Sequence, residues 1–171
     1  MLKFKSLVPK LTIFLLFILA MPTLLNAKKN DQGLVPTYTA EGAGATTDAS
    51  HQIKITIYSN KKDVSDVDLG RCAVHASLFQ DIDDTTNTGY GSTAVKKAIM
   101  GSPAAEAQYI DFFEPFFRNG DCDRYVQNIK DHTVVKSGKG YKISAIVKVN
   151  KAQLQKDLVS QGLVKNLGSG W

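Results

Sequence analysis

One short segment, Arg71-Cys72-Ala73-Val74-His75, holds the residue types that a thiol enzyme needs. A thiol and an imidazole three residues apart share one side of a helix, and a neighbouring cation favours the reactive thiolate. However, Cys72 also belongs to an apolar stripe, where free cysteines act as small hydrophobic side chains. Cysteine–histidine nucleophile pairs also usually come from distant parts of a chain. We therefore favour an inert, buried Cys72 over a nucleophile.

The chain has two cysteines, Cys72 and Cys122. An even number of cysteines in an oxidising compartment suggests a disulfide, and a bridge that closes a loop of about 50 residues would stabilise the fold by roughly 4 kcal/mol. Against a bridge, Cys122 lies in a charged segment, 119–123, which we expect to be a loop with an exposed thiol. A Cys72–Cys122 bridge and two free thiols both stay open, with the bridge slightly disfavoured.

Oxygen ligands gather at Asp81, Asp83, Asp84 and Asn87. A calcium loop would need glycine at its sixth place and glutamate at its twelfth. This segment has neither residue there, so a solvated acidic loop is the better interpretation. The three histidines are His51, His75 and His132. None of them has a further cysteine or acidic residue at the spacing that zinc ligands need. We expect no metal and no cofactor.

Four phenylalanines lie within six residues of one predicted helix. They cannot all point to one side of a helix, so at least one should be exposed or contact a partner. The alternative is burial of the rings on either side of a kink at Pro115. The predicted loop 83–92 is a second candidate contact, because long loops often carry binding residues. The candidate partner-binding residues are Phe112, Phe113, Phe116, Phe117, Asp83, Asp84 and Tyr90.

The first 27 residues are typical of a cleavable signal peptide. Three lysines precede an apolar run, 11–21, which rises only about 16 Å as a helix and is too short to span a bilayer. We expect cleavage after Ala27, which lowers the net charge from +5 to +2 by removing those lysines. We therefore predict export to the periplasm, the outer-membrane periphery or the medium, no stable transmembrane span, and no nucleic-acid partner.

The first half of the mature chain is predicted as a flexible tether, a strand and a helix. Residues 28–50 lack apolar surface and periodicity, which favours a tether. Apolar residues alternate over Gln52–Tyr58, which predicts a strand. Asp66 or Asp68 can cap the following helix, whose apolar stripe runs at spacings of three and four as far as Ile82.

The second half is predicted as two helices, a hairpin and a last helix. A short helix over 93–100 precedes a second helix that starts at Pro103 and kinks or ends near Phe113. Strands over 125–136 and 141–149 flank a turn at 137–140. The last helix is capped by Asn150 and ended by Gly162.

These elements predict one α+β domain over 51–167, followed by a tail at 168–171. Three strands with period-two alternation need one covered face, and only the helices can cover it. We therefore expect a two-layer sandwich, with a three-stranded, mainly antiparallel sheet covered on one face by helices.

Residues 141–164 form a strand followed by a helix with leucine, leucine and glycine spacing. This segment resembles the end of the FlgT N-terminal-type domains of cell-envelope accessory proteins, and the mature chain resembles exported proteins of Bacteroidota. The resemblance implies an assembly role in the envelope without catalysis, and it assigns no functional residues.

The sequence favours a non-enzymatic binding or assembly module that contacts a protein partner of the cell envelope. The first alternative is a thiol-dependent redox or hydrolytic enzyme that uses Cys72 or Cys122. The second alternative is a carrier of a small ligand, bound between sheet and helices.

Overall fold

A computed structural model gives the fold and describes residues 33–44, 49–84 and 94–165. These residues belong to one compact unit, Gln32–Trp171. The predicted leader, the predicted tail and Tyr90 lie outside the described residues, so what we expect of them stays a prediction.

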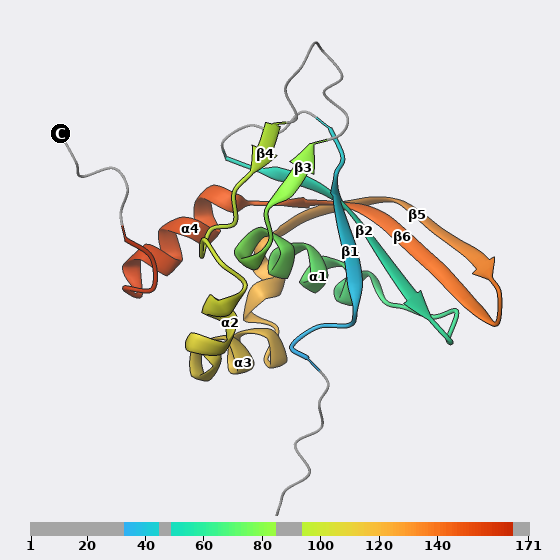
Figure 1. Cartoon of the computed structure of the whole chain (residues 1–171), viewed down its shortest axis with the longest axis horizontal. Helices are drawn as coiled ribbons and strands as arrows, with labels where there is room; N and C mark the ends of the chain where they lie inside the picture. Colours follow the sequence, from blue (N-terminus) through green and yellow to red (C-terminus); the bar gives the residue numbers. More distant parts are fainter. Residues whose placement is uncertain (1–32, 45–48, 85–93, 166–171) are drawn as a thin grey trace, which may run out of the picture. The chain divides into compact units, whose positions relative to one another are not determined.

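The main sheet has four antiparallel strands in the order β1-β2-β6-β5 (Figure 1). The strands are β1 (Tyr38–Gly42), β2 (His51–Ser59), β5 (Val126–Ser137) and β6 (Gly140–Val149). Because side chains alternate along a strand, the isoleucines of β2 share one face with apolar residues of β6. The buried residues of this inner face are Ile53, Ile55, Ile57, Ile143, Ala145 and Val147.

Helix α1 (Asp66–Phe79) packs on this inner face and contacts all four strands. The predicted stripe is confirmed within the helix, since Leu69, Cys72 and Ala76 are fully buried. Its expected last member, Ile82, lies outside the helix. The N-cap is Ser65, whose hydroxyl accepts a hydrogen bond from the Asp68 amide at 3.1 Å. The cap is therefore neither Asp66 nor Asp68, the two residues expected from the sequence. Asp68 lies in the first turn, where its carboxylate accepts a hydrogen bond from the Ser65 hydroxyl at 2.8 Å and completes a reciprocal cap.

The remaining helices of the described residues follow α1 along the chain. Helices α2 (Ala104–Gln108) and α3 (Ile110–Arg118) lead into a short 3-10 helix, η1 (Asp121–Tyr125), and α4 (Lys151–Ser160) follows the sheet. The Asn150 side chain caps α4, and Gly162 has a φ of +71°, as predicted from the sequence.

The sheet-plus-helices class predicted from the sequence is confirmed, but the expected three strands were wrong. The missing strand, β1, lies inside the predicted tether and pairs with β2 in register, Tyr38 opposite Ile57. β1 contains few apolar residues. Its order depends on contacts with distant residues, which local composition does not reveal.

A second sheet replaces the predicted helix over 93–100. Strand β4 (Ala94–Lys96) pairs with β3 (Ile82–Asp84), which also takes the start of the predicted loop 83–92. Hydrogen bonding between two short segments thus decides the structure here, and periodicity over three residues is too short to predict it.

The helix break predicted near Phe113 lies earlier, at Tyr109. Helix α3 continues through Pro115 to Arg118 although proline removes one helical hydrogen bond. The buried rings of Phe113 and Phe117 explain this, because packing of an apolar face supplies most of the stability of a short helix.

Candidate functional site

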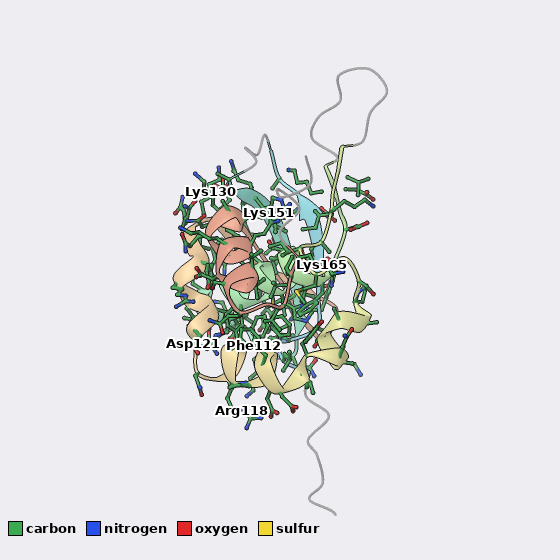
Figure 2. All side chains as sticks on the ribbon, turned by 90° about the vertical axis from the view of Figure 1, so that its left-hand side faces the viewer. Phe112, Arg118, Asp121, Lys130, Lys151 and Lys165 are labelled. Carbon is green, nitrogen blue, oxygen red and sulfur yellow. The ribbon has the colours of Figure 1, made fainter. Side chains whose placement is uncertain are left out.

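A cleft of about 590 Å³ opens between α3, η1 and α4. Figure 2 looks onto α4, with the labelled Phe112 and Asp121 below it. We call this site the α3–η1–α4 cleft. Its lining consists of Asp111, Phe112, Pro115, Phe116, Asp121, Arg124, Tyr125, Asp157, Leu158, Ser160 and Gln161.

Aromatic and aliphatic side chains provide the apolar part of the cleft. The rings of Phe112 and Phe116 stack with their centroids 5.7 Å apart and their planes 23° apart. Phe116 is 6% exposed, whereas Phe112 is half-buried and presents part of its ring to the cleft. Pro115 and Leu158 complete this surface.

A hydrogen-bonded cluster of Arg124, Tyr125 and Asp157 forms the polar part. The Tyr125 hydroxyl donates to Asp157 Oδ2 at 2.7 Å, and an Arg124 nitrogen donates to the same oxygen at 3.2 Å. Gln153 Nε2 donates to the other carboxylate oxygen at 2.7 Å. The hydrogen bond from Tyr125 lowers the pKa of Asp157 below its usual value, so Asp157 is ionised at neutral pH.

The cleft is acidic overall. Three carboxyl groups, those of Asp111, Asp121 and Asp157, line it with a single guanidinium, that of Arg124. Arg124 is already engaged, since its guanidinium carbon lies 4.9 Å from the Tyr125 ring centroid and its nitrogen bonds Asp157. The cleft therefore favours a group that combines apolar surface with positive charge.

The structure divides the four phenylalanines predicted to bind a partner. Phe113 and Phe117 are buried at 0% and 1% exposure, so neither ring offers surface for a direct contact with a partner. They pack in the core, where Phe113 meets Phe79 and Phe117 meets His75. Phe112 keeps a partly exposed ring, as the spacing of the four rings predicted for at least one of them.

The acidic candidates of the loop 83–92 do not join the cleft. Asp83 is exposed on β3 and is not among the cleft residues. The backbone of Asp84 belongs to β3, and its side chain is not described. Tyr90 lies outside the described residues.

Both cysteines are free and fully buried. Burial raises the pKa of Cys72 to about 12 and that of Cys122 to about 12, so both thiols are protonated at neutral pH. Burial of Cys72 was predicted correctly, but the expected exposure of Cys122 was wrong. Its segment forms η1, and the contacts of η1 with α1 and α3 cover the thiol.

His75 bridges two distant elements and does not bond Cys72. Its Nδ1 lies 2.7 Å from the Tyr38 hydroxyl, and its Nε2 lies 3.1 Å from Glu106 Oε2. Burial lowers the pKa of His75, which favours a neutral ring that accepts from Tyr38 and donates to Glu106. Sequence reasoning missed this bridge because its partners lie 37 and 31 residues away.

Within residues 33–44, 49–84 and 94–165, no group of three metal-ligating side chains occurs. Asp81, part of the rejected calcium pattern, instead accepts from Lys97 Nζ at 2.6 Å and from the Ala98 amide at 3.0 Å. His132 pairs with Asp66 at 2.8 Å.

Comparisons with protein-family models, curated proteins and solved structures found no match for this chain. In the described part of the chain, no helix has the length and apolar character needed to cross a membrane.

Proposed function

We propose that this protein is a binding module without catalysis of its own, and that its α3–η1–α4 cleft receives a segment of a protein partner. The observation that carries the proposal is the half-buried Phe112, which stacks on Phe116 inside a cleft whose rim bears Asp111 and Asp121. Partly exposed rings beside fixed polar groups are typical of the anchor points of protein interfaces.

The composition of the cleft defines the partner segment. An aromatic or branched aliphatic side chain fits the apolar part formed by Phe112, Pro115 and Leu158. A lysine or arginine beside it would meet Asp121 and Asp111. We therefore expect a short peptide with one large apolar residue next to a basic residue.

The thiol-enzyme alternative gains no support from the geometry. A thiol nucleophile must reach the thiolate form and meet a substrate, whereas Cys72 and Cys122 are fully buried and protonated at neutral pH. His75, the expected base, is occupied by Tyr38 and Glu106.

Selection from a random peptide library against the purified chain tests the proposal. We expect enrichment of peptides that pair a large apolar residue with lysine or arginine. Phe112→Ser should weaken the binding of these peptides about tenfold or more, the range of an interface anchor. Asp121→Lys should weaken the binding of the same peptides, but it should not affect the binding of peptides in which the basic residue has been replaced.

Tyr58→Ser is the matched control, because Tyr58 is 61% exposed on β2 and is not part of the cleft lining. Circular dichroism checks that each variant keeps the fold. The proposal is wrong if the selection enriches no such motif, or if Phe112→Ser and Tyr58→Ser bind the selected peptides equally well.

A further inference from the structure

The outer face of the main sheet is not covered by any helix of the described residues. Helix α1 packs on the inner face, where the isoleucines of β2 are buried. Residues opposite each other in neighbouring strands share a face, so the register places Tyr58, Lys142 and Val135 in one row across the outer face. Figure 1 shows this end of β2, β6 and β5 projecting beyond the helices.

This outer face is basic. A second row contains Lys54, Ile146 and Lys130, and Lys148 lies in the next row. Glu41 of β1 is opposite Lys54 and 3.8 Å from its ammonium nitrogen. The described residues include no ion-pair partner for the lysines of β5 and β6, which are Lys130, Lys136, Lys142 and Lys148.

The β5–β6 hairpin concentrates this charge. Its residues 126–149 include five lysines and one acid, Asp131. Asp131 sits in a bulge of β5 with a φ of +56°, between the paired Lys130 and Thr133. The hairpin therefore carries a net charge of +4 on an edge of the sheet.

Exposed apolar side chains lie beside the lysines. Tyr58 is 61% exposed and Val135 is 58% exposed. Aliphatic and tyrosine side chains are stabilised at the boundary between lipid headgroups and acyl chains, and lysines are attracted to the lipid phosphates. Sheets that bind single-stranded nucleic acid instead need several aromatic rings for base stacking, and Tyr58 is the one ring in these rows.

We propose that the outer face of the sheet, together with the β5–β6 hairpin, docks on an anionic lipid surface. Lys130, Lys142 and Lys148 supply the attraction to lipid phosphates, and Tyr58 and Val135 enter the headgroup region. This surface lies on different elements from the α3–η1–α4 cleft, so the two proposals stand or fall separately.

Co-sedimentation with vesicles tests the docking. We expect the purified full chain to bind vesicles of phosphatidylcholine with phosphatidylglycerol, to bind pure phosphatidylcholine weakly, and to dissociate as salt rises. A triple variant, Lys130→Ala with Lys142→Ala and Lys148→Ala, should bind about 100-fold more weakly, since each basic residue near such a surface contributes about fivefold in affinity. Adding Val135→Ser to this triple variant should weaken vesicle binding further.

A second triple variant controls for net charge. Lys97→Ala with Lys156→Ala and Lys165→Ala removes the same charge away from the outer face and should keep most of the binding. Equal losses in the two triple variants, or equal binding to both kinds of vesicle, would overturn the proposal. Tighter binding of an oligonucleotide than of anionic vesicles, with the same lysine dependence, would overturn it in favour of nucleic acid.

Discussion

Tyr125 illustrates how a single residue connects the core to the cleft. Its ring is 2% exposed and contacts Phe116 at a centroid distance of 6.0 Å, whereas its hydroxyl reaches Asp157 at 2.7 Å. Burial and the bond to Asp157 raise the pKa of Tyr125, so the phenol stays protonated and donates. One side chain thus fixes both the apolar and the acidic part of the cleft.

We predict that Tyr125→Phe lowers the free energy of unfolding by about 1 kcal/mol, the net contribution of one hydrogen bond. The ring still fills its place in the core, but Asp157 loses one of the two donors that lie 2.7 Å from its carboxylate. Urea unfolding followed by circular dichroism measures the change. Tyr58→Phe is the control, since the Tyr58 ring is exposed, and an equal effect of the two substitutions would contradict the prediction.

The residue scale also shows why this cluster escaped prediction. Burial of Cys72 followed from its place in an apolar stripe of one helix. By contrast, Tyr125 and Asp157 are 32 residues apart and sit on different elements, so no local spacing connects them. The bridge of His75 to Tyr38 and Glu106 has the same origin.

Among the elements, strands and caps with strong local signals were predicted well. The alternation in β2 and β6 and the cap at Asn150 all have counterparts in the structure. The failures occur where tertiary contacts decide. β1 is ordered by pairing with β2, β4 by pairing with β3, and α3 continues through Pro115 because its rings are buried.

The first residue of β6, Gly140, packs closely against the end of β2. A Cβ placed on Gly140 would lie 2.7 Å from the backbone oxygen of Ser59, the last residue of β2. Real side chains do not approach a backbone oxygen so closely, so β6 can begin beside β2 only with glycine at this position.

We predict that Gly140→Ala destabilises the protein by about 1–3 kcal/mol, the usual cost of overpacking. The backbone of Ser59 or of the 137–140 turn must move to relieve the contact. Thermal unfolding measures the loss, with the neighbouring Lys139→Ala as control because Lys139 is exposed. A Gly140→Ala variant as stable as Lys139→Ala would show that the turn adapts without cost.

At the scale of the whole molecule, two buried histidines couple folding to pH. His51 is 4% exposed, and its Nδ1 has no hydrogen-bond partner among the described residues. Burial, together with the positive charges of Lys151 and Lys96, lowers the pKa of His51 to about 4. Burial also lowers the pKa of His75. Both side chains are therefore neutral in the folded protein at pH values where they are protonated in the unfolded chain.

The sign of the pH dependence follows from proton counting. Below pH 6.5 the unfolded chain binds protons at both histidines that the folded protein does not bind, so the free energy of unfolding falls as pH falls. For His51 the loss extends from about pH 6.5 to about pH 4, with a slope of up to about 1.4 kcal/mol per pH unit. Paired carboxylates such as Asp157 act at lower pH, because their pKa values lie below the usual range.

We predict that His51→Leu reduces this acid destabilisation between pH 6.5 and pH 4 and leaves the contribution of His75. The substitution removes the group that the unfolded chain protonates, and it also removes a buried nitrogen without a partner, so stability at pH 7.5 should be unchanged or higher. Urea unfolding at several pH values, compared with the unsubstituted chain, gives both quantities. Parallel pH profiles for the two proteins would mean that His51 accepts a proton in the folded state as readily as in the unfolded chain, and burial would then not control its charge.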